Sequence, residues 1–92
     1  MSEPELTAEQ LIEQIKQLRV ADLVVSTVTT LGQIAYAKLE ESSRDLDQAR
    51  LAIDSIQVLL PKLDGHVPAE LSRDLGQMVT NLQLAYAAAA TG

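Results

Sequence analysis

The sequence predicts a small all-α protein, and three observations favour that fold class. Apolar residues recur three and four positions apart in four separate segments, which is the spacing of one helix face. Residues typical of helix starts precede several of these segments. The 92 residues are 47% hydrophobic and contain no Cys, so one small domain must form without a disulfide framework. We expect a flexible terminus over 1–6 and one helical domain over 7–90.

The first helix is predicted over 7–19. Thr7 serves as its N-cap and Gln10 stands at the third helical position, as in a capping box. Its apolar stripe is short and narrow, and consists of Ala8, Leu11, Ile15 and Leu18.

The second helix is predicted over 22–39, with Asp22 as its N-cap. Many β-branched residues between Leu23 and Thr30 favour a strand by local propensity. The apolar spacing and a length of about 17 residues favour a helix instead. A single bent helix from Thr7 to Lys38 stays open, because no Gly or Pro enforces a break.

The third helix is predicted over 45–63 and the fourth over 68–89. Asp45 and Gln48 form a capping-box start, and Pro61 should kink the third helix or end it near Leu60. Gly65 provides a C-terminal stop, since Gly readily adopts positive φ. Pro68 suits the first turn of the fourth helix.

Composition and motifs argue against most chemical functions. Thirteen acids against seven scattered bases give a net charge of −6, which disfavours binding to nucleic acid. His66 stands alone in a turn, and no nucleophile elbow or Gly-rich phosphate loop is present. We therefore expect no enzyme activity, no cofactor and no metal, and regard the acidic cluster as a solvated helix start (Glu40, Glu41, Asp45, Asp47).

The termini and the uncharged second helix bear on location. The first fourteen residues carry four Glu and no base, unlike a signal peptide, so we expect a cytoplasmic protein. The uncharged stretch Leu23–Ala37 would cover only about 22 Å as a helix, less than the roughly 30 Å of a membrane core. We expect neither a membrane nor a nucleic-acid partner.

Three segments together resemble a known family. They are Val20–Val28, the helix start Asp45–Asp54 and the closing Leu82–Tyr86, with Leu39 between them. This pattern resembles the small bacterial proteins grouped as domain of unknown function 1844. The resemblance implies a bacterial, cytoplasmic, all-α protein and brings no catalytic residues. Some members are associated with genes near those of translation factors.

The leading functional hypothesis is a non-catalytic helical interaction module that self-associates and docks a protein partner. A second copy would complete the small bundle as a homodimer, because the second helix is apolar nearly all round. The predicted interface is Val24, Val25, Val28, Leu31, Gly32, Ala35 and Tyr36.

Three alternatives stay open. One is a four-helix monomer in which the first helix folds back over the second. Another is an accessory factor of translation that contacts ribosomal proteins through its acidic surface. The last is a small-ligand carrier with a cleft between helices, built from Tyr36, Asp54, Asp74 or Tyr86.

Overall fold

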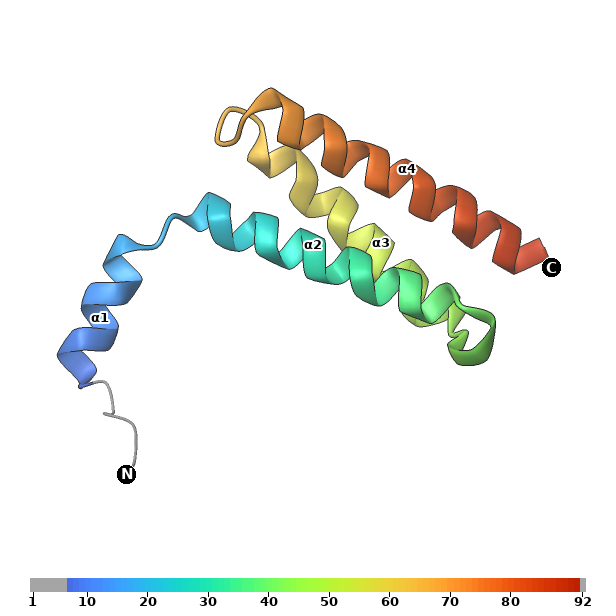
Figure 1. The fold of residues 1–92 in the computed structure, drawn as a ribbon, viewed down its shortest axis with the longest axis horizontal. Helices are drawn as coiled ribbons and strands as arrows, with labels where there is room; N and C mark the ends of the chain where they lie inside the picture. Colours follow the sequence, from blue (N-terminus) through green and yellow to red (C-terminus); the bar gives the residue numbers. More distant parts are fainter. Residues whose placement is uncertain (1–6, 92) are drawn as a thin grey trace.

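The computed structural model describes residues 7–91, and the predicted flexible terminus over 1–6 lies outside the described residues. The protein is all-α, and no strand is present over residues 7–91. The helices are α1 (Ala8–Gln17), α2 (Val20–Leu39), α3 (Leu46–Leu59) and α4 (Ala69–Thr91), with short 3-10 helices η1 (Glu41–Ser43) and η2 (Leu60–Leu63). Three helices, α2 to α4, pack together, and α1 stands apart from them (Figure 1).

The core between α2, α3 and α4 is wholly apolar in the described part of the chain. It contains Val28, Ala35, Leu39, Ala49, Ala52, Ile53, Ile56, Leu63, Leu75, Val79 and Leu82. Four of these, Ala49, Ala52, Ile53 and Ile56, belong to α3, and their three- and four-residue spacing is that of one helix face. Sequence spacing alone located this face, because helical positions three and four apart lie together.

The β-branched segment of α2 is helical, as its apolar spacing predicts. The side-chain hydroxyls of Thr27 and Thr29 donate to the carbonyl oxygens of Leu23 and Val25, at 2.8 and 2.9 Å. These bonds satisfy the hydroxyls on the helix surface. Tertiary packing of the buried face therefore overrides local strand propensity here.

The start of α2 differs from the prediction. The helix begins at Val20 with Arg19 as its N-cap residue, so Asp22 is not the N-cap. Asp22 lies in the first turn, where its carboxylate is 3.9 Å from the Arg19 guanidinium and complements the helix N-terminus. The two N-terminal helices are also not continuous, because Leu18 and Arg19 both have extended backbone angles.

The third helix ends where Pro61 requires it. Regular α-helix stops at Leu59, and Pro61 lies within η2. Gly65 has a φ of 81°, which suits a residue without a Cβ and reverses the chain before α4. The Asp45 side chain accepts a hydrogen bond from the Gln48 amide at 3.2 Å, which confirms Asp45 as the N-cap of α3.

Candidate interaction surface

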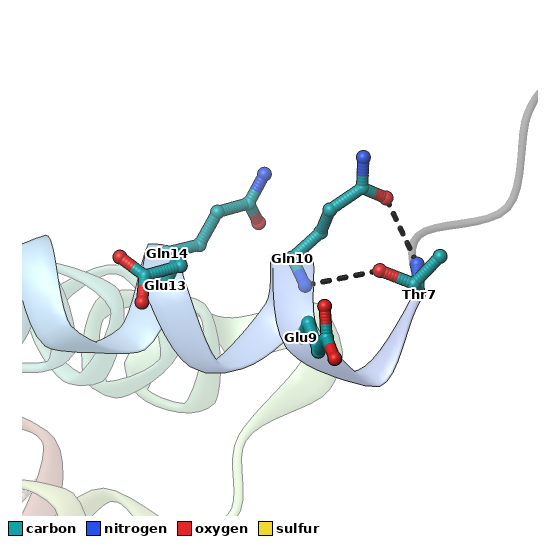
Figure 2. A pocket seen from close by; sticks show the side chains of 5 residues that line it. All are labelled: Thr7, Glu9, Gln10, Glu13 and Gln14. Atoms are coloured by element: carbon teal, nitrogen blue, oxygen red, sulfur yellow. Dashed lines mark hydrogen bonds between the residues drawn. The ribbon is translucent and has the colours of Figure 1, made fainter.

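The first helix carries an amphipathic sequence but has no partner within the described residues. The Thr7 hydroxyl accepts from the Gln10 amide at 3.1 Å and the Gln10 side chain accepts from the Thr7 amide at 2.9 Å, so the predicted capping box is confirmed (Figure 2). No residue of α1 is buried, and α1 contacts no other helix of residues 7–91. The capping hydrogen bonds therefore stabilise α1 locally, whereas packing against the core contributes nothing to its stability.

Large apolar side chains of α1 and of its C-cap residue Leu18 are exposed to solvent. We call them the α1 stripe, with exposed fractions of 45, 50, 65 and 64% for Leu11, Ile12, Ile15 and Leu18. Single exposed hydrophobic residues are common, but three on one face of a ten-residue helix, followed by its C-cap Leu18, form a patch that marks an interaction site. Such a helix is marginal alone in water and gains its stability from packing.

The opposite side of α1 is polar. Thr7, Glu9, Gln10, Glu13 and Gln14 surround a hollow at this surface, and all five belong to one helix and its cap (Figure 2). No second element encloses the hollow, so it is open helix surface rather than a ligand pocket. A polar face beside the α1 stripe is the expected arrangement for a helix that binds in a groove.

A second apolar surface lies between α2 and α3. A cavity of about 280 Å³ is lined there by Leu31, Ile34, Gln48, Leu51, Ala52 and Ser55, which we call the α2–α3 groove. None of these side chains is charged, although the chain as a whole is acidic. Leu31 and Ile34 lie on the flank of α2 away from α4, because neighbouring Gly32 faces Met78 of α4.

Further exposed hydrophobic residues extend the α2–α3 groove. Leu23 on α2 is 62% exposed, and Val58 on α3 is 68% exposed. Leu23 is eleven positions before Ile34, and Val58 is seven positions after Leu51, so each shares the groove-side flank of its helix. A short connection over 40–45 makes α2 and α3 antiparallel (Figure 1). Leu23 near the start of α2 and Val58 near the end of α3 therefore lie toward the same end of the helix pair.

The residues of the predicted interface on α2 differ in their exposure to solvent. Val28, Gly32 and Ala35 are buried inside the chain's own core, where they face α3 and α4. Val24, Val25 and Leu31 are half-buried against that core, and Tyr36 is exposed. A second copy could therefore reach Leu31 and Tyr36 but not the three buried residues of this fold. The dimer itself stays a prediction.

The prediction that the second helix is apolar nearly all round is wrong. Its solvent-facing side carries Ser26, Thr27, Thr29, Thr30 and Gln33. Sequence analysis missed the α2–α3 groove, although the signal was present. Leu51 and Val58 are apolar residues outside the core stripe of α3, and they are seven positions apart.

The residues considered for a ligand cleft do not come together at one. The cavities beside Glu9, Leu31 and Leu63 are lined by none of these residues, which are Tyr36, Asp54, Asp74 and Tyr86. Asp54 pairs with Arg50 at 3.7 Å on the surface, and Tyr86 packs against the core. A further cavity of about 140 Å³ beside Val24, Leu63 and His66 is smaller than the roughly 300 Å³ at which ligand pockets begin.

Candidate metal ligands are also dispersed. Within residues 7–91, no three His, Cys, Asp or Glu side chains gather closely enough to hold a metal ion. The imidazole of His66 is exposed, and its backbone carbonyl accepts a hydrogen bond from Arg19 Nη2 at 3.1 Å. His66 thus helps anchor the start of α2 to the α3–α4 turn.

The second helix is longer than the uncharged stretch on which the expectation of no membrane span was based. The observed helix α2 has 20 residues, which cover about 30 Å and match a membrane core. By length and composition α2 is therefore able to cross a membrane. The same properties occur in core helices of globular proteins, and one face of α2 does pack on α3 and α4.

A comparison with family models identifies the family. The model described as Domain of unknown function (DUF1844) matches residues 18–88. The chain therefore belongs to this family, as its sequence pattern indicates. The match begins at the link before α2, so it leaves out α1. No curated protein and no solved structure matches.

Proposed function

We propose that this DUF1844 protein is a non-catalytic helical interaction module that self-associates, and that its exposed apolar helix faces are the binding surfaces. The observation that carries the proposal is the exposed α1 stripe: Leu11, Ile12 and Ile15 of the helix are exposed, and no other helix of residues 7–91 contacts α1. An amphipathic helix with an open apolar face has the form that binds in a hydrophobic groove.

The other surfaces support this proposal. The described charged side chains are exposed or half-buried, and the ion pairs are surface pairs such as Glu13–Lys16 at 3.6 Å. Acid–base chemistry needs convergent groups in a shielded site, and the cavities here are small or open. The features that stand out are instead hydrophobic and lie on α1, α2 and α3.

We also propose that the module acts in an aqueous compartment, as in the cytoplasm. The outer face of α2 carries hydroxyl and amide side chains, and its inner face is matched by α3 and α4. An amphipathic membrane-surface helix is typically rich in Lys and Arg, whereas α1 carries Glu9 and Glu13 against a single Lys16. Anionic lipids would repel that balance of charge.

Mass measurement over a range of concentration tests the proposal. We expect light scattering after size exclusion to give twice the chain mass of 9.9 kDa at micromolar concentration, and a lower average mass on dilution. A mass of one chain at every concentration up to several hundred micromolar would reject self-association. A mass that does not exceed two chains and falls on dilution indicates specific pairing. Aggregation would instead give larger and heterogeneous particles.

A further inference from the structure

We infer that two copies exchange their first helices, so that the α1 stripe of each copy binds in the α2–α3 groove of the other. This inference rests on the proposed self-association and adds which surfaces meet. Both surfaces are apolar, and each lacks a covering element within the described residues. The polar face of α1, with Glu9 and Glu13, would stay in water.

The link before α2 directs α1 away from its own groove. Leu18 has φ −71° and ψ 135°, and Arg19 has φ −88° and ψ 127°, so both are extended. Arg19 is anchored by its bond to the His66 carbonyl at 3.1 Å. Figure 1 shows the result, in which α1 stands beyond the end of the three packed helices.

Length also keeps the α1 stripe from the cavity of its own groove, although not from the exposed extension at Leu23. Of the residues that line the cavity, the one nearest the start of α2 is Leu31, which lies about 16 Å along the helix from Val20. A helix folded back from Leu18 would bring its stripe only about 10 Å along α2, because Leu11 is seven residues away. A second copy is free of this limit. Exchange of a terminal element between copies is also a low-cost route to a dimer.

The available area fits a specific dimer. Full burial of a large aliphatic side chain removes on the order of 100 Å² of apolar surface from water. The large side chains of the two surfaces, Leu11, Ile12, Ile15, Leu18, Ile34 and Leu51, are 44–65% exposed, and two-fold symmetry makes the contact twice. About 600–900 Å² of apolar surface would be buried, which suits a standard interface of roughly 1,200–2,000 Å² that is a little over half apolar.

The absence of Cys allows a direct test by disulfide formation. The full chain would carry Ile15→Cys in the α1 stripe together with Leu51→Cys in the α2–α3 groove, since both side chains are exposed. Mild oxidation should give a covalent product of two chains, seen on a non-reducing gel. A control variant pairs Gln17→Cys with Leu51→Cys. Gln17 is two residues from Ile15 and faces about 200° away around the helix, so we expect at least tenfold less product.

The outcomes separate this inference from the proposal on which it rests. A disulfide within single chains would overturn the exchange, because α1 would then cover its own groove. Equal cross-linking of the Ile15→Cys and Gln17→Cys pairs, or none in a chain that light scattering shows to be dimeric, would overturn the exchange and leave self-association standing. A parent chain that is monomeric throughout would overturn both. Far-ultraviolet circular dichroism of each variant checks that the helices are retained.

Discussion

The contact between α2 and α4 at Gly32 gives the sharpest prediction about packing. A Cβ added at Gly32 would lie 2.6 Å from Met78 Sδ and 2.9 Å from Met78 Cε, so Gly32→Ala forces the end of that side chain to move. Gly76 in α4 is the matched control, because a Cβ there would meet nothing within 4 Å. Each substitution replaces a Gly by the best helix former inside a helix.

The expected magnitudes follow from two opposing effects. Replacing Gly by Ala inside a helix stabilises it by about 0.8–1.0 kcal/mol, and Gly76→Ala should raise the free energy of unfolding by nearly that amount. At Gly32 the displaced Met78 side chain costs about 0.5–1.5 kcal/mol, the range for a strained rotamer. Gly32→Ala should therefore be close to neutral. The atoms that the added Cβ meets are at the end of the flexible Met78 side chain. The loss of stability should therefore be smaller than that caused by overpacking a rigid core.

Urea denaturation of both variants at one protein concentration measures this difference, since the midpoint and slope give the free energy of unfolding. Repeating Gly32→Ala in a Met78→Ala background should recover most of the gain seen at Gly76, because the obstructing atoms are then absent. Equal stabilisation by Gly32→Ala and Gly76→Ala in the parent chain would refute the close approach of α2 and α4 at this point.

Two more predictions concern the division of the chain into a core and a separate helix. Val28→Asp should unfold the protein, since Val28 is fully buried and an uncompensated buried charge costs about 3–5 kcal/mol. The control Thr30→Asp, at an exposed position of the same helix, should leave the circular dichroism spectrum nearly unchanged. A folded Val28→Asp variant would contradict the assigned core. Deletion of Met1–Leu18 should change the free energy of unfolding, measured at high dilution, by less than about 0.5 kcal/mol, because no residue of α1 is buried. Loss of the cooperative urea transition in that truncated chain would show instead that α1 belongs to the core.

The sequence predicted the elements of this fold well where one physical effect dominates. The core stripe of α3, the caps at Thr7 and Asp45 and the stop before Pro61 follow from local spacing and local hydrogen bonding. The start of α2 was harder, because Arg19 has no side-chain capping bond and gives no sequence signal. An apparent N-cap three residues later, Asp22, proved to be a first-turn acid.

The interaction surfaces could be predicted only in part, because they depend on which faces other helices cover. The spacing of the α2 residues identified an apolar face but not its partner, and α3 and α4 cover Val28 and Ala35. From the sequence, the interface was predicted on α2 rather than on the narrow stripe of α1, yet no other described helix covers α1. Tertiary arrangement, which periodicity does not encode, decides this difference.

The most direct test of the account is the effect of a charge in the α1 stripe on the dissociation constant of the dimer. Ile15→Glu places a carboxylate within the stripe, and Gln17→Glu adds the same charge two residues away on the polar side. By sedimentation equilibrium, we expect Ile15→Glu to raise the dissociation constant at least tenfold, a loss of about 1.4 kcal/mol, and Gln17→Glu to change it little. Equal dissociation constants for the parent chain and Ile15→Glu would contradict the claim that the exposed face of α1 is a binding surface.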